Sequence, residues 1–281
     1  MAASDRPTDT AGGVAGDGSV VCLAIETSNP SLPAPAASGV AVGRILPGDI
    51  GRTVLLGSSP LDALDKRRDD LAMCVQRALA AAGLGLGDVG CIAISVGPGG
   101  FTSIRSAIAM GAMLAETLGV MGAVMGGSGV LCRGVPSVLS AWFGLRELFG
   151  AGPVGVALAV KAETGFGARF GAHDLVGAHD LGGAVYGQAM AGAIVAGVDA
   201  DAWMADLAGG VLAADEHLPE AFAAAAVRAG VRVVAPRLDG ASCLAAAAVC
   251  PSVGAEAVAA IYGREPEAVT IWRRRAAEGK R

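Results

Sequence analysis

The feature that most constrains the fold is a glycine-proline turn that separates a short apolar run from a long stretch of small residues. Cys91–Val96 is a run typical of a buried strand, and Thr102–Leu118 has the spacing of a helix that is apolar nearly all round. Such a helix has to be covered on more than one side. The turn between them consists of Gly97, Pro98, Gly99, Gly100 and Phe101. The segment therefore predicts a strand, a sharp bend and a closely packed helix.

The residues before this turn predict a layered α/β arrangement. Val20–Ser28 indicates a buried strand, while Ser38–Val42 and Thr53–Leu56 are expected to complete an antiparallel meander after a proline-rich loop. Asp69–Ala82 has apolar residues at three- and four-residue spacing, which predicts an amphipathic helix. The resulting order of strand, strand, strand, helix, strand and helix is that of one half of the actin-like ATPase (ASKHA, ribonuclease H-like) fold.

A second half of the same α/β kind is expected to follow, smaller and less regular. Val154–Val160, Phe166–Phe170 and Val231–Val234 are predicted strands, and His217–Ala229 and Ala255–Tyr262 predicted helices, while residues 171–183 look irregular. No internal sequence repeat is visible. The expected organisation is a disordered segment over residues 1–19, an N-terminal lobe over 20–125, and a degenerate C-terminal lobe with a basic tail over 126–281.

Charge and composition exclude several classes of function. The formal net charge of −5 gives no overall field for a polyanion, so a stand-alone nucleic-acid reader is disfavoured, and the basic residues of the C-terminal tail are interpreted as a solvated terminus. Although the mean hydropathy is +0.55, Glu116 and several glycines interrupt the most apolar stretch, Ser106–Cys132, so no membrane span is expected. No secretory signal is expected, because no hydrophobic region of the kind precedes Val20. The six cysteines of the chain lack metal-site spacing and suit a reducing cytoplasm.

Three segments resemble the TsaB (YeaZ) family. Leu23–Ser28, which reads LAIETS, resembles the family's opening strand LAIDTS, with Glu26 in place of the usual aspartate. Gly97–Arg105, GPGGFTSIR, resembles the signature GPGSFTGLR, and Tyr262–Arg275 resembles the C-terminal run. The resemblance covers about Leu23 to Gly122. Ala159 and Lys161 stand where the family has aspartate and arginine.

The resemblance implies a non-catalytic scaffold. Proteins of this family dimerise with the catalytic subunit TsaD, recruit the ATPase TsaE, and support threonylcarbamoyl transfer to a tRNA adenosine next to the anticodon. The implied docking face is formed by the two N-terminal helices, with tRNA contacted only indirectly and a homodimer possible when TsaD is absent. No cofactor and no metal are expected, apart from a nucleotide at an interface with partners. The implied partner-binding residues are Leu71, Val75, Ala78, Thr102, Arg105, Ala109, Ala112 and Met113.

Two alternatives remain open. The first alternative to the scaffold is an active nucleotide-dependent ATPase or phosphotransferase of the same superfold, and the second is a drifted paralogue with another partner. Against the first, Ser28 runs into Asn29 and Pro30, and proline donates no N–H to a phosphate. Glu26 is expected to be satisfied by local hydroxyls rather than to hold a metal-bound water. His173 and His179 are interpreted as solvated loop residues rather than metal ligands.

Overall fold

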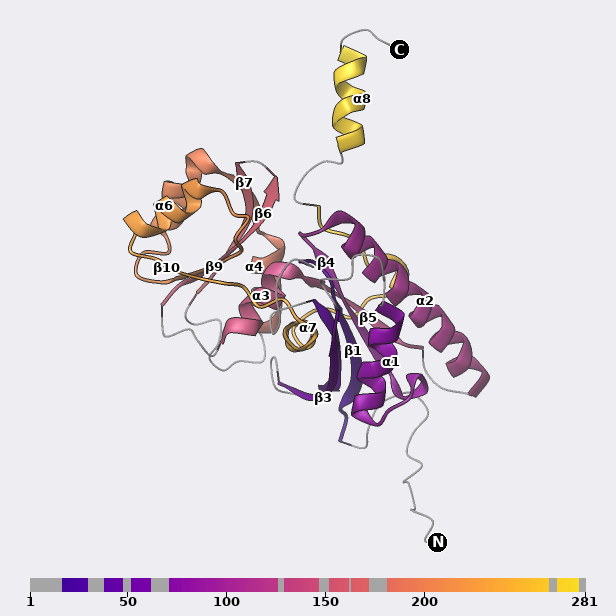
Figure 1. The fold of residues 1–281 in the computed structure, drawn as a ribbon. Helices are drawn as coiled ribbons and strands as arrows, with labels where there is room; N and C mark the ends of the chain where they lie inside the picture. The colour runs from indigo at the N-terminus through magenta and orange to yellow at the C-terminus, as the bar shows by residue number, and fades with distance from the viewer. Residues whose placement is uncertain are drawn as a thin grey trace.

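Two five-stranded mixed sheets with helices around them form the body of the protein (Figure 1). The computed structural model describes residues 17–29, 38–47, 52–61, 71–125, 129–146, 152–161, 163–171, 181–262 and 267–277. The predicted α/β class is confirmed. His173, His179 and most of the expected disordered segment lie outside the described residues, although Ser19 of that segment is buried.

The first sheet has the strand order β3-β2-β1-β4-β5. Its central strand pairs antiparallel with β2 and parallel with β4, from Cys22 beside Cys91 to Ile25 beside Ile94. Both central strands are almost wholly buried because helices cover both faces of the sheet. The strands are β1 (Val20–Glu26), β2 (Gly39–Ile45), β3 (Thr53–Pro60), β4 (Cys91–Gly97) and β5 (Leu131–Pro136).

The second sheet repeats this topology, with the order β10-β9-β6-β7-β8. In each sheet, the first strand pairs antiparallel with the second, and the second pairs antiparallel with the third. On the other side, the first strand pairs parallel with the fourth, and the fourth pairs parallel with the fifth. The backbone therefore contains an internal duplication that the sequence does not display. The strands are β6 (Val154–Lys161), β7 (Thr164–Phe170), β8 (Ala193–Ala196), β9 (Val211–Ala214) and β10 (Arg232–Val234).

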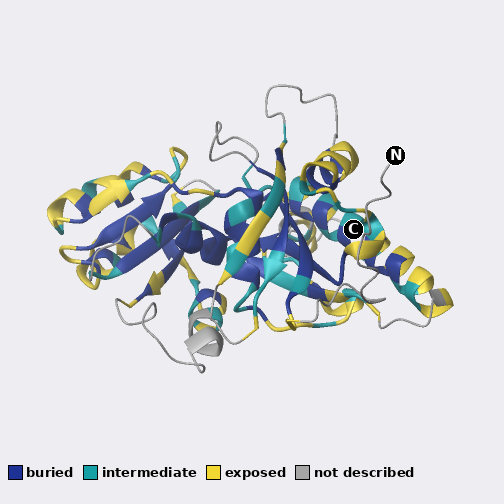
Figure 2. Ribbon diagram, turned by 90° about the horizontal axis from the view of Figure 1, so that it is seen from below, coloured by how far each residue is buried: buried dark blue, intermediate teal, exposed yellow. Residues whose placement is uncertain are grey.

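The helices form layers outside and between the sheets (Figures 1 and 2). One apolar core joins the first sheet to α1 and α2, a second joins both sheets through α3 and α7, and a third joins the second sheet to α5 and α6. The helices are α1 (Leu71–Ala82), α2 (Phe101–Met125), α3 (Ser137–Leu145), α4 (Leu181–Met190), α5 (Ala200–Ala205), α6 (Glu220–Arg228), α7 (Gly240–Ala247) and α8 (Glu267–Ala277).

The first sheet does not end at residue 125, where the boundary between the two lobes was expected. β5 is the edge strand of the first sheet, and α7, from the far end of the sequence, packs against β1 and β2. The first sheet and its covering helices thus consist of residues that come before the second sheet in the sequence and residues that come after it. The expected helix over Ala255–Tyr262 is also wrong: only Ala255–Ala257 forms a short 3-10 turn, after which Ile261 donates its backbone N–H to the Val96 carbonyl at 2.6 Å.

Helix α2 meets the criterion for a membrane span by length and composition alone, over Phe101–Val124. The expectation that this stretch does not span a membrane stays a prediction, and Glu116 alone does not decide it, because a single charge in a long apolar stretch is tolerated. One such helix is weak evidence for a membrane, since α2 also packs on the first sheet through Ile104, Ala107 and Leu114. Its outer side, however, carries exposed apolar side chains, among them Val120 and Val124.

Candidate functional site

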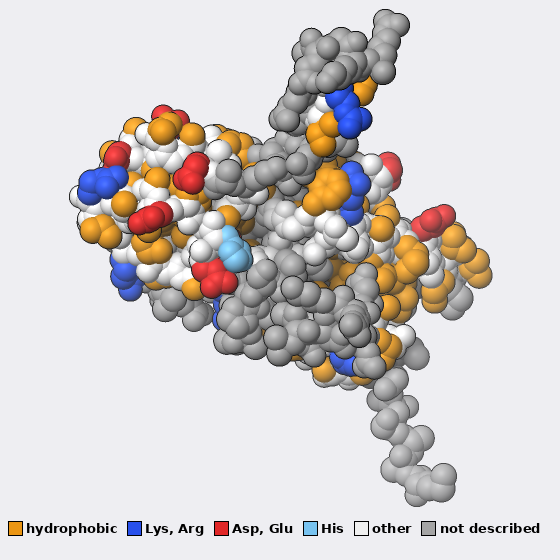
Figure 3. Space-filling model, turned by 45° about the horizontal axis from the view of Figure 1, so that its top comes forward, with side chains coloured by type: hydrophobic (Ala, Val, Ile, Leu, Met, Phe, Trp, Pro, Cys, Tyr) orange, Lys and Arg blue, Asp and Glu red, His pale blue; other side chains and the backbone are white. Residues whose placement is uncertain are grey.

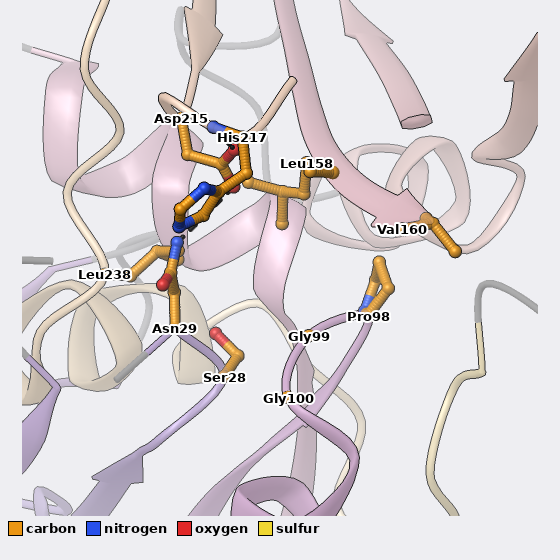
Figure 4. A pocket seen from close by; sticks show the side chains of 11 residues that line it. Ser28, Asn29, Pro98, Gly99, Gly100, Leu158, Val160, Asp215, His217 and Leu238 are labelled. Carbon is orange, nitrogen blue, oxygen red and sulfur yellow. Dashed lines mark hydrogen bonds between the residues drawn. The ribbon is translucent and has the colours of Figure 1, made fainter. Parts of the chain in front are cut away.

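A cleft of about 310 Å³ lies between the two sheets, where the carboxyl ends of their strands approach each other (Figure 4). The loops after β1 and β4 form one wall, and β6 together with the loop after β9 forms the other. This edge is where open α/β sheets place their ligands. The residues that line it are Ser28, Asn29, Pro98, Gly99, Gly100, Leu158, Ala159, Val160, Asp215, His217 and Leu238.

At the end of β1, Glu26 fixes the first turn of the cleft wall. Its side chain is fully buried, and its Oε1 accepts hydrogen bonds from the backbone N–H of Ser28 at 2.8 Å and from the Ser28 hydroxyl at 2.6 Å. Burial raises the pKa of Glu26 from 4.5, and the hydrogen bonds from Ser28 offset that rise only in part. The expectation that local hydroxyls satisfy this carboxyl is confirmed for Oε1 only, because Oε2 is buried and has no hydrogen-bond partner among the described residues.

The glycine-proline turn is held against that loop by its backbone. A Cβ atom on Gly99 would lie 2.2 Å from the carbonyl oxygen of Ser28, so only glycine permits this approach. The neighbouring Gly100 donates its N–H to the same carbonyl at 2.7 Å. Gly97 has a φ of +98°, a backbone conformation that residues with a side chain rarely adopt. These contacts place the turn in the cleft and the start of α2 beside it.

Asp215 lies across the cleft and connects the two walls. Its Oδ1 accepts the backbone N–H of His217 at 3.0 Å, and its Oδ2 accepts the Asn29 side-chain amide at 3.4 Å. Burial raises the pKa of Asp215 above its ordinary value, while the bond from His217 acts in the opposite direction. Asn29 belongs to the loop after β1 and Asp215 to the loop after β9, so this bond ties the first sheet to the second.

The lining of the cleft favours a structural contact over phosphate chemistry. Of the described residues that line it, only Asp215 and His217 are titratable, and none is lysine or arginine. A bound triphosphate needs cations or a row of free backbone N–H groups. Within the described residues, no group of three His, Cys, Asp or Glu side chains is placed to hold a metal ion. The described walls thus provide few groups for nucleotide chemistry.

A second candidate site is the outward face of α2. The described apolar side chains on this face are strongly exposed: Met113 is 53% accessible, Val120 62% and Val124 79%. Thr102, Arg105 and Ala109 are also exposed, and Ala112 is half-buried. In Figure 3, hydrophobic side chains gather over the elongated right-hand end of the molecule, where Figure 1 shows α2. We call the exposed residues of α2 from Thr102 to Val124 the α2 face.

The residues expected on α1 occupy a different position. Leu71, Val75 and Ala78 are 3%, 5% and 0% accessible, because they point into the core between α1 and the first sheet. They are not available to a partner, so the expected contact surface has to be corrected on this helix. The outward side of α1 instead presents Met73 and Gln76, one turn apart. The helical spacing identified the helix, but the buried side was taken for the docking side.

An aromatic and cationic cluster caps the N-terminal end of the α2 face. The Arg105 guanidinium lies 4.0 Å from the centre of the Phe101 ring and donates from Nε to the Tyr262 hydroxyl at 3.0 Å. The two rings are 5.3 Å apart. Sequence reasoning singled out Phe101 and Arg105 but not their contact with Tyr262. Asn29, Asp215 and His217 were likewise not assigned to one site, because only the fold brings these loops together.

These observations define a class of protein. Two mixed sheets with the same strand order, a central helical layer and a cleft at their carboxyl ends are consistent with an actin-like α/β fold. The described walls of the cleft carry two titratable side chains, whereas the α2 face presents exposed apolar side chains.

The comparisons indicate a particular relative. The chain resembles a structure described as YeaZ from Pseudomonas aeruginosa, with 20% identity, a TM-score of 0.56, and coverage of 86% of this chain and 99% of that one. It is equally similar to a structure described as an uncharacterized protein with similarity to peptidase YEAZ from Pseudomonas aeruginosa, at 20% identity and a TM-score of 0.57, covering 87% and 99%. The fold is that of YeaZ (TsaB).

Two further comparisons bear on the family. Residues 55–121 match the family model of TsaD, described as tRNA N6-adenosine threonylcarbamoyltransferase. This match covers β3 to most of α2 and leaves the rest of the chain unmatched. The search of curated proteins found no match.

Proposed function

We propose that this chain is a non-catalytic scaffold subunit, which binds a TsaD-type transferase in the cytoplasm and supports threonylcarbamoyl transfer to a tRNA adenosine next to the anticodon. The YeaZ-like fold and the partial match to the TsaD family favour this pathway. In this proposal the two sheets and their helices are the two lobes of the actin-like fold, the second degenerate. The observation that carries it is the α2 face, where Met113, Val120 and Val124 are exposed apolar side chains that a partner would cover.

The composition of this face suits a second helix as its partner. Between Thr102 and Val124, the charged residues are Arg105 and Glu116, and alanines alternate with methionine and valine. Small residues let helix axes approach to about 8–10 Å, and methionine adapts to an irregular neighbour. A matching pair of helices on a TsaD-type subunit would cover it. A second copy of this chain would cover it in the same way when TsaD is absent, and a TsaE-type ATPase would then join the complex.

Gel filtration with a TsaD-type transferase tests the proposal. The unaltered chain should co-elute with it, and Met113→Glu should abolish co-elution, because the variant places a carboxylate in an apolar interface. Val227→Glu is the matched control, since Val227 is 79% exposed on α6, away from the α2 face. Co-elution that survives Met113→Glu, or separate migration of the unaltered chain, would overturn the proposal.

A second candidate is an active nucleotide-dependent ATPase or phosphotransferase, which the location of the cleft favours. A nucleotide that binds there would stabilise the folded chain, with a rise in melting temperature that grows with ligand concentration. The scaffold proposal predicts no such rise for the isolated chain. If the chain binds neither nucleotide nor TsaD, the drifted paralogue with another partner is the reading that stands, and a pull-down from native lysate would identify that partner.

A further inference from the structure

Three aromatic rings of the described residues are exposed, two of them on the folded body and one on α8. Most described aromatic side chains are buried or half-buried, but Phe101 and Tyr262 are each 41% exposed and Trp272 is 68% exposed. Phe101 and Tyr262 are in contact, and Trp272 lies on α8, which stands away from the rest of the body in Figure 1. α8 begins at Glu267, five residues after Tyr262. A chain of that length spans at most about 18 Å between the Cα atoms of these two residues.

Positive charge is concentrated in the sequence around Trp272. Residues 267–281 contain five basic and two acidic side chains and carry a formal charge of +3, although the whole chain carries −5. The remainder of the chain is therefore at −8. On α8, Arg273 and Arg275 are exposed beside Trp272, and Arg105 adds a guanidinium between the other two rings. A charge distribution so uneven points to a polyanionic partner at this end alone.

We propose that α8, together with the cluster of Phe101, Arg105 and Tyr262, is a direct binding surface for single-stranded or looped RNA. Exposed rings stack on unpaired bases, and arginines contact the phosphates between them. RNA is favoured over a lipid surface because Phe101 and Tyr262 lie on the folded body, with Arg105 packed on them, as a stacking platform rather than an apolar helix face. This inference goes beyond the proposed function, which requires only indirect contact with tRNA.

Fluorescence anisotropy with the full chain and a labelled single-stranded RNA of mixed sequence tests the inference. Binding should weaken as salt rises, and Trp272→Ala should weaken it by about 5- to 150-fold through loss of one stacked base. The double variant Arg273→Ala and Arg275→Ala should lower the slope of log K against log salt by about 0.7 for each lost phosphate contact. These three side chains are exposed, so the variants should fold as the parent does.

The control is Arg228→Ala, which removes an exposed arginine on α6 that is paired with Asp201 at 2.7 Å. It should leave RNA binding unchanged. An RNA affinity that is undetectable, or equal in the Trp272→Ala variant and the parent, would overturn the inference. So would binding to vesicles that contain phosphatidylserine without binding to RNA, which would make α8 a membrane contact. None of these assays contains TsaD, and therefore their failure is distinct from a failure of the Met113→Glu test.

Discussion

The substitution Gly99→Ala tests how the glycine-proline turn is held. An added Cβ would meet the Ser28 carbonyl oxygen at 2.2 Å and its carbonyl carbon at 2.8 Å, both backbone atoms that cannot rotate away. Overpacking of this kind costs about 1–3 kcal/mol. Moving the two loops apart also breaks the bond of 2.7 Å from Gly100 to Ser28, which costs about another 1 kcal/mol. The total destabilisation is roughly 2–4 kcal/mol, or about 4–8 °C in melting temperature for a chain of this size.

Differential scanning fluorimetry measures the effect, with Gly119→Ala as the matched control. Gly119 lies within α2, and a Cβ there meets nothing within 4 Å. That variant should gain about 0.5–1 kcal/mol because alanine loses less backbone entropy in a helix. Opposite signs for the two glycine-to-alanine changes are expected. If Gly99→Ala were as stable as the parent, the close packing of the turn on Ser28 would be refuted.

Two further predictions concern the core. Burial raises the pKa of Glu26, so as the pH rises from 4.5 this carboxyl ionises in the unfolded chain before it ionises in the folded chain. The contribution of Glu26 to the free energy of unfolding therefore falls until the pH passes the raised pKa. Glu26→Gln lacks this titration, and the melting temperature of the parent relative to the variant should therefore fall over that window; a constant difference would contradict the argument. Phe222→Ala should cost about 3–5 kcal/mol in urea unfolding, since the ring is fully buried between α6 and the second sheet, whereas a cost below 1 kcal/mol would show that this core is loosely packed.

The first half of the fold was predictable because its signals are local. Val20–Ser28 and Cys91–Val96 are continuous apolar runs, and the structure places β1 and β4 there within two residues. The expected helix Thr102–Leu118 is present but extends to Met125, since alanine and methionine favour the helix and no proline follows. The turn from Gly97 to Gly100 could be predicted because glycine and proline have strong backbone preferences.

The second half was harder to predict because its order depends on distant contacts. β9 and α7 are short and rich in alanine, so they carry little periodic signal. Their positions follow from pairing with β6 and from packing against the first sheet. The same limit applies to the cleft, where Asn29 and Asp215 are 186 residues apart. Helical spacing identified the apolar side of α1, but it does not tell whether the core of the same chain or a partner covers that side.

Hydrogen exchange measured by mass spectrometry tests whether the α2 face is a docking surface. Adding a TsaD-type transferase should slow exchange in peptides of α2 between Thr102 and Val124, while peptides of α6 keep their rates. Unchanged exchange along α2 in a complex that does form would contradict the account, since the partner would then be bound elsewhere.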